Sequence, residues 1–419
     1  MTTDQLNIAL LGAMLILLIG AIAVTFATRI GLPALLAFLG LGLIIGEDGL
    51  GIEFDDKNLA QVLGFLALAV ILAEGGLSTR WSEIRPALPF ALLLSTVGVG
   101  VSVAVVAVVI RFALGVDWQI AVLIGAIVSS TDAAAVFSIL RRLPLQARVR
   151  SALEAESGLN DPPVVILVVI VVSGTWADTG LVGSAAMFGY QLIVGALIAL
   201  VVATLGGWLL RRIAVPEPGL YPAAMFGLPL LAFGAAGAIG ASGFLAAYVA
   251  GLLLCNAQLP HRRHTLNFAH GVAWIAQITL FVMLGLLATP HDLPAAVAPA
   301  LIIGGALLLL ARPASVLVTS AAMIRVRSPE ADDQTSSSKT RRLQWQLPLR
   351  EQAFLSWAGL RGAVPIVLAT IPQGQGISDT ENLFDIVLVL VVIFTLIQGP
   401  TLPAAARKLG VTAEPGRKT

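Results

Sequence analysis

Apolar stretches of about 20 residues dominate the sequence, and this is the length a helix needs to cross roughly 30 Å of hydrocarbon. About thirteen of them follow one another, at approximately 6–27, 32–47, 59–78, 87–111, 119–140, 157–174, 181–210, 221–238, 242–257, 270–288, 294–323, 350–372 and 384–406. Only 12% of the residues are charged, whereas a soluble domain carries about 25%. The sequence therefore predicts an all-α integral membrane protein of about thirteen transmembrane helices.

The basic residues test this count, because they concentrate on the cytoplasmic side of a membrane. All but four of the 25 Lys and Arg residues fall on one side if the N-terminus lies outside and the C-terminus inside. Of the exceptions, Lys57 and Arg111 fall outside, while Arg312 and Arg361 lie within or at the edge of spans. A wrong number of spans would distribute the basic residues over both sides of the membrane. We therefore expect thirteen spans in a bacterial cytoplasmic membrane, with that orientation.

The domain organisation is expected to be simple. Residues 1–407 form one transmembrane domain and residues 408–419 a short cytoplasmic tail, while the polar segment 325–349 has the composition of a cytoplasmic linker. The net charge of +1 provides no dense basic face for nucleic acid. No cofactor is expected, and no Cys or His lies near enough to the acidic motifs to suggest a transition metal.

Charged side chains inside apolar spans are the most informative residues, because each is costly to bury in lipid. Asp161 and Arg361 each lie eleven residues beyond a basic residue that limits the span, and Asp132 lies nine residues before one. In a helix these separations amount to about 14 to 16 Å. Three charged groups from three spans are therefore expected near the membrane midplane.

Two of these spans contain sequence that disfavours a continuous helix at that level. Span 5 reads Ser-Ser-Thr131-Asp132, whose hydroxyls compete for backbone hydrogen bonds. Span 12 reads Gly359-Leu-Arg361-Gly-Ala-Val-Pro365, with two glycines and a proline. Spans 5 and 12 cross in opposite directions, which predicts an inverted repeat of spans 1–6 and 8–13 with unwound helices at both places. Packing faces of small residues are the alternative.

Span 6 opens at 156–161 with Glu-Ser-Gly-Leu-Asn-Asp. Residues four apart share a helix face, so Ser157 and Asp161 point one way. We hypothesise that they face Thr131 and Asp132. Hydroxyl and carboxylate oxygens are ligands for a hard cation. The sequence therefore predicts a cation site between spans 5 and 6.

The neighbouring face of span 6 carries Glu156 and Asn160, about 100° further round the helix. A buried Arg361 at the midplane would be costly without an acidic partner. Glu156 is the nearest candidate, and we expect these two residues to form a structural ion pair with Asn160 beside it.

The three motifs together resemble the cation/proton antiporters of the Asn-Asp branch. They are most similar to its bacterial cell-volume-regulation members, regarded as potassium/proton antiporters, and the resemblance extends over all thirteen spans. It implies a homodimer in which spans 5, 6 and 12 and their flanking helices form a core, with spans 5 and 12 crossed, and the others form a scaffold. It also implies a cation held by Thr131, Asp132, Ser157 and Asp161, and an ion pair of Glu156 with Arg361 beside Asn160.

Residues and resemblance together predict exchange of a monovalent cation for protons. Asp161, assisted by Asp132, binds a proton or a dehydrated cation, but never both. Asn160 replaces the second aspartate of electrogenic relatives, so one-for-one electroneutral exchange is expected. Ligand types do not separate K⁺ from Na⁺, and the resemblance favours K⁺.

Three other classes of protein share parts of this pattern. An intramembrane aspartyl protease would also use two buried aspartates, but its Gly-x-Gly-Asp sequence is absent. A cation channel would need a repeated carbonyl filter, which the sequence does not contain. A sodium-coupled symporter shares broken helices and would be recognised by transport of an organic solute.

Overall fold

The computed structural model describes residues 3–29, 34–52, 54, 56–131, 143–212, 219–257, 259–326, 347–374, 380 and 382–413. Its helices are α1 (Thr3–Arg29), α2 (Ala34–Ile45), α3 (Lys57–Ser78), α4 (Trp81–Ile84), α5 (Leu88–Leu93), η1 (Leu94–Gly98), α6 (Val99–Leu114), α7 (Trp118–Ser129), α9 (Ala147–Leu159), α10 (Asp161–Val172), α11 (Thr175–Arg212), α12 (Leu220–Ala238), α13 (Gly243–Asn256), α14 (Arg262–Leu286), α15 (Leu293–Ala306), η2 (Leu307–Ala311), α16 (Arg312–Val326), α18 (Leu349–Trp357), α19 (Ala363–Gly374) and α20 (Leu383–Lys408). Segments η1 and η2 are π-helical. The all-α architecture is confirmed.

Eight helices in the described part of the chain are long and apolar enough to cross a membrane, and five shorter apolar helices accompany them. A membrane protein of many spans is therefore confirmed, while the count of thirteen stays a prediction. Two spans were predicted to begin too late in the sequence. Helix α9 begins at Ala147 rather than 157, and α14 begins at Arg262 rather than 270. Both helices begin with polar turns, which a search for apolar stretches leaves out.

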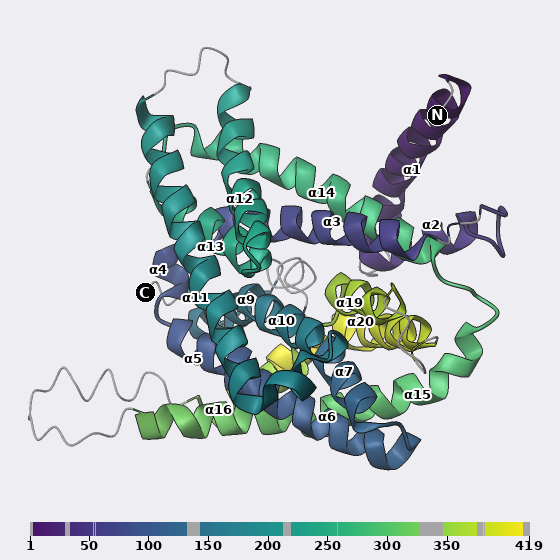
Figure 1. The fold of residues 1–419 in the computed structure, drawn as a ribbon, viewed down its shortest axis with the longest axis vertical. Coiled ribbons are helices and arrows are strands. Elements are labelled where there is room, and N and C mark those ends of the chain that lie inside the picture. The colour runs from purple at the N-terminus through teal and green to yellow at the C-terminus, as the bar shows by residue number, and fades with distance from the viewer. Residues whose placement is uncertain are drawn as a thin grey trace, which may run out of the picture.

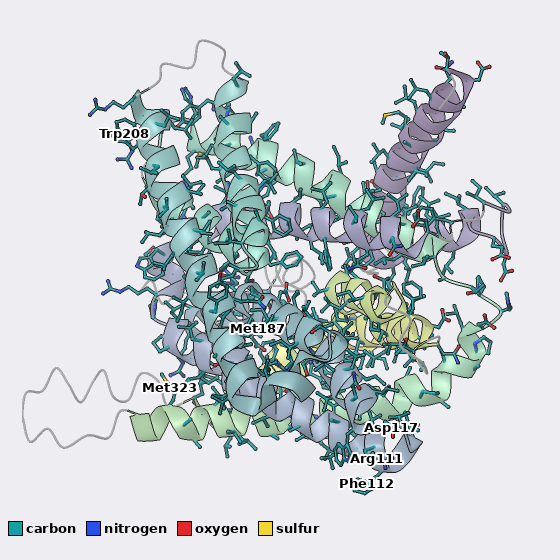
Figure 2. All side chains as sticks on the ribbon, viewed as in Figure 1. Arg111, Phe112, Asp117, Met187, Trp208 and Met323 are labelled. Carbon is teal, nitrogen blue, oxygen red and sulfur yellow. The ribbon has the colours of Figure 1, made fainter. Side chains whose placement is uncertain are left out.

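Several connections between helices lie on two opposite sides of the molecule (Figure 1). The N-terminus and the connections that follow α2 and α14 lie on the right, whereas α4, the end of α16 and the C-terminus lie on the left. Figure 2 places Trp208 and Met323 on the left, and Arg111 and Asp117 on the right. Connections predicted for the same side of the membrane therefore lie together.

One set of helices, which we call the glycine-packed group, comprises α2, α3 and α11–α14. Helices α2 and α14 meet at Gly42 and Gly285, where a Cβ on either residue would lie 2.8 Å from the Cα of the other. Helices α3 and α13 meet at Gly76 and Gly251, and a Cβ on Gly251 would lie 2.8 Å from the carbonyl oxygen of Ala73. Glycine is needed at these positions because the backbones touch.

The other set, the broken-helix group, comprises α5–α7, α9, α10, α15, α16 and α18–α20 with η1 and η2. The chain between α18 and α19, residues 358–362, is not helical, so the predicted break in span 12 is present. Segments η1 and η2 lie in spans 4 and 11, which correspond in the predicted repeat. The two glycine crossings correspond in the same way. One joins span 2 to span 10 and the other joins span 9 to span 3, and the repeat pairs span 2 with span 9 and span 3 with span 10. These pairs fit an inverted repeat.

The two predicted polar segments differ in what the structure describes. Most of the linker 325–349 lies outside the described residues. The tail is partly ordered by contacts, because the amide of Ala413 donates to Pro144 O at 2.6 Å and that of Gln146 donates to Val411 O at 3.0 Å. The described part of the tail is thus attached at the start of α9.

Candidate functional site

The break in span 5 begins where α7 ends at Ser129. Ser130 follows with an extended backbone (φ −66°, ψ 141°), so the last carbonyls of α7 have no donor from a next helical turn. Thr131 is also outside the helix and is buried. Asp132, predicted as the second carboxylate of the site, lies outside the described residues.

Arg361 comes from the non-helical stretch between α18 and α19 and is only 1% exposed. Its Nη1 donates to Ser129 O at 2.6 Å and also to Ser130 O. A guanidinium thus satisfies the free carbonyls of α7 and complements the negative end of its dipole. The predicted ion pair of Arg361 with Glu156 was wrong, because a buried arginine can be satisfied by the carbonyls at a helix end.

The partner of Glu156 is Arg312, the first residue of α16. Arg312 donates from Nη1 to Glu156 Oε1 at 2.5 Å and from Nη2 to Oε2 at 3.3 Å, and both side chains are buried. Arg312 Nη2 also donates to Leu355 O at 3.0 Å, near the end of α18. A Cβ on Gly359 would lie 2.7 Å from Arg312 Nε. The glycine in the break therefore makes room for this guanidinium.

The polar residues predicted as cation ligands gather beside the end of α7. Ser130 Oγ donates to Asp161 Oδ1 at 2.6 Å, and the carboxylate is 3% exposed. Thr131 Oγ1 lies 3.4 Å from Ser157 Oγ. Asn160 Nδ2 donates to the same Thr131 oxygen at 2.5 Å, so Asn160 also contacts this group of residues. Residues three apart on α9 share a face, which brings both side chains to Thr131.

The structure places the predicted residues Thr131, Ser157 and Asp161 near the end of α7, and it adds contacts that the sequence did not predict. The Ser130 hydroxyl next to Asp161 could have been found, since Ser130 precedes Thr131 in the same unwound stretch. Arg312 was predicted to lie within or at the edge of a span, and its partner could not be named from the sequence. Its contact with Glu156 required the packing of α16 against α18, which spacing within the sequence does not reveal.

These features define a class of protein. Two helix breaks in a bundle of membrane-spanning helices bring a buried carboxylate, hydroxyl oxygens and capping arginines together, which is the arrangement of a secondary transporter's binding site. The chain belongs to the sodium/hydrogen exchanger family: the family model described as "Sodium/hydrogen exchanger, transmembrane" matches residues 14–408. It is a cation/proton antiporter, and it is a transporter rather than an enzyme.

Curated relatives and solved structures agree with this family. The K(+)/H(+) antiporter NhaP of Alkalimonas amylolytica is 36% identical over 419 residues, which cover 99% of this chain and 69% of the relative. The K(+)/H(+) antiporter NhaP2 of Shewanella oneidensis is 35% identical with the same coverage. The sodium proton antiporter MjNhaP1 of Methanocaldococcus jannaschii has a TM-score of 0.75 at 19% identity, covering 96% of this chain and 99% of that one. That structural likeness concerns the fold.

Proposed function

We propose that this antiporter exchanges K⁺ for H⁺, one for one, by competition at Asp161. Asp132, Thr131 and Ser157 complete the cation site. When Asp161 is ionised, the oxygens around it replace the hydration shell of the cation. When Asp161 is protonated, the cation leaves. The site then changes its access from one side of the membrane to the other with either the cation or the proton bound. The empty, charged site makes this change poorly.

The observation that carries the proposal is the burial of Asp161, whose carboxylate accepts a hydrogen bond from Ser130 just beyond the end of α7. Such oxygens suit a hard monovalent cation. The two buried arginines are engaged elsewhere, Arg312 with Glu156 and Arg361 with the carbonyls of α7. Both guanidinium groups therefore stabilise the polar groups at the ends of the interrupted helices.

Proton efflux from proteoliposomes, followed with a pH-sensitive dye, tests the exchange. Addition of K⁺ should collapse the pH gradient in the wild type and should not do so in Asp161→Asn. Asp117→Asn is the matched control, because Asp117 is an exposed carboxylate at the start of α7 and should leave exchange unchanged. Full exchange by Asp161→Asn would contradict the mechanism. A measurable current on a solid-supported membrane would contradict the one-for-one stoichiometry.

Na⁺ is the second candidate cargo, since the names of the family and of MjNhaP1 both refer to sodium. The curated relatives at 35 and 36% identity are named as K⁺/H⁺ antiporters, which favours K⁺. Both ions are hard, so cavity size and not ligand type decides between them. The same vesicles with NaCl in place of KCl separate the two.

We further infer a homodimer in the bacterial inner membrane, with the N-terminus outside and the C-terminus inside. Helix α1 supports the dimer, because it stands away from the rest of the chain in Figure 1 and packs mainly on α2 and α14. Its surface exposes Leu10, Leu11, Leu18 and Phe26. Light scattering in detergent would measure the subunit number, and labelling of cysteines introduced at each terminus would measure the orientation.

A further inference from the structure

A tyrosine of the glycine-packed group lies directly against the helix that carries the proposed cation site. Tyr248 of α13 is 1% exposed and is among the largest fully buried side chains of the described residues. A Cβ built on Gly158 of α9 would lie 2.5 Å from its Cζ, 2.6 Å from its hydroxyl oxygen and 2.7 Å from its Cε2. Helix α9 can therefore occupy its position only because residue 158 has no side chain.

Helix α13 turns one face to each group of helices. Phe244, Tyr248 and Leu252, spaced four apart, belong to the large apolar cluster that contains the broken helices. Ala246 and Ala250 belong to a second cluster formed with α3, α11, α12 and α14. Tyr248 thus lies at the middle of the α13 face that meets the site.

The ring has little freedom to move. A Cβ on Gly76 of α3 would collide with the carbonyl oxygen of Tyr248, so the backbone at this residue is pressed against α3. The hydroxyl oxygen is itself shielded from solvent, so protein atoms enclose the end of the ring. Since main chain and ring are both confined, α9 and not Tyr248 would have to yield to a larger residue at 158.

We propose that Tyr248 is a positioning residue. It fixes how closely α9 approaches the glycine-packed group and so sets the geometry of the cation site. Gly158 directly follows Ser157 and precedes Asn160 by two residues. Ser157 and Asn160 reach Thr131 at 3.4 and 2.5 Å, and a displacement of α9 changes both distances. This inference rests on the proposed function in one respect, that these residues bind the cation.

Size exchange between the two positions tests the inference. Gly158→Ala should raise the apparent KM for the cation at least tenfold, about the effect expected from a displacement near 1 Å. Adding Tyr248→Ala should restore most of the affinity, because the ring that the new methyl group meets is gone. Adding Tyr248→Phe should not, because Cζ and Cε2 remain. Gly75→Ala in α3 is the control, since its Cβ would meet nothing within 4 Å.

Three results would overturn the inference: a normal KM in Gly158→Ala, a loss confined to Vmax, or a Gly158→Ala/Tyr248→Ala protein no better than Gly158→Ala alone. If the double variant does not fold, Tyr248→Leu replaces Tyr248→Ala in it. Melting temperatures of the same proteins separate this inference from the proposed function. If the wild type exchanges no cation, the proposed function fails, yet Gly158→Ala should still melt lower and regain stability with Tyr248→Ala.

Discussion

Two crossings of the glycine-packed group bring helices together backbone to backbone, whereas buried arginines connect the interrupted helices of the broken-helix group. Gly42 against Gly285 and Gly76 against Gly251 leave no room for a side chain, and dispersion between the backbones holds these crossings. Arg312 and Arg361 instead connect α16 to α9 and α18, and the α18–α19 break to the end of α7. The two groups lie in the same apolar surroundings and are stabilised by different interactions.

The difference follows from the helix breaks. A continuous helix satisfies its own backbone, so contact area alone can hold it against its neighbour. A helix that ends inside the membrane leaves carbonyls without donors, and only a polar group from elsewhere can satisfy them. A guanidinium brings several donors in one plane, which suits this task. The arginines are therefore the consequence of a site made of broken helices.

Of the variants that test this comparison, the removal of an arginine should lower stability the most. Arg312→Met should lower the free energy of unfolding by about 3 to 5 kcal/mol, because it leaves Glu156 charged and unpaired in an apolar interior. Glu156→Gln in the same protein should recover part of that loss. Thermal unfolding in detergent measures both proteins.

Arg361→Met supplies the matched comparison. It should also destabilise, since the carbonyls of Ser129 and Ser130 lose their donor, but Glu156→Gln should give it no recovery. Recovery of Arg361→Met together with no recovery of Arg312→Met would mean that Glu156 pairs with Arg361 after all.

A methyl group at a glycine crossing should have a smaller effect. Gly251→Ala should cost about 1 to 3 kcal/mol, because its Cβ would lie 2.8 Å from the carbonyl oxygen of Ala73 and the backbones must separate. Gly234→Ala in α12 should have no cost or a slight gain, since nothing lies within 4 Å of that Cβ and alanine favours the helix. Equal melting temperatures for the two variants would show that the crossings are not close-packed.

Much of the fold could be predicted from the sequence, because a membrane leaves few choices. The apolar stretches predicted a membrane protein of many spans, and the glycines and proline around Arg361 predicted the break between α18 and α19. The π-helices η1 and η2 could not be predicted, since their sequences, Leu-Ser-Thr-Val-Gly and Leu-Leu-Leu-Leu-Ala, carry no feature that distinguishes them from α-helix.

The sequence predicted that Thr131 and Ser157 lie close together, but it did not predict the partner of Glu156. The spacing on α9 placed Ser157 near Thr131, and the structure has them adjacent. The choice between two buried arginines for Glu156 depended on how α16 packs, which is a tertiary property. The contact of Asn160 with Thr131 was not predicted, because residues three apart share a helix face as well as residues four apart.

The smallest effect on stability is expected from the loss of a contact between two connections outside the membrane, those of His291 and Asp48. His291 lies in the connection from α14 to α15, and its Nδ1 is 3.1 Å from Asp48 Oδ2, in the connection from α2 to α3. The hydrogen bond to Asp48, then the charges of Asp292 and Asp48, raise the pKa of His291 above its ordinary value, with a lesser contribution from Glu47. The contact therefore stabilises the protein below the ordinary pKa of about 6.5 and ceases to do so as pH rises through the raised pKa. Nuclear magnetic resonance of the imidazole protons should show the titration midpoint of His291 falling in Asp48→Asn, and an unchanged midpoint would mean that the pair does not form in the membrane.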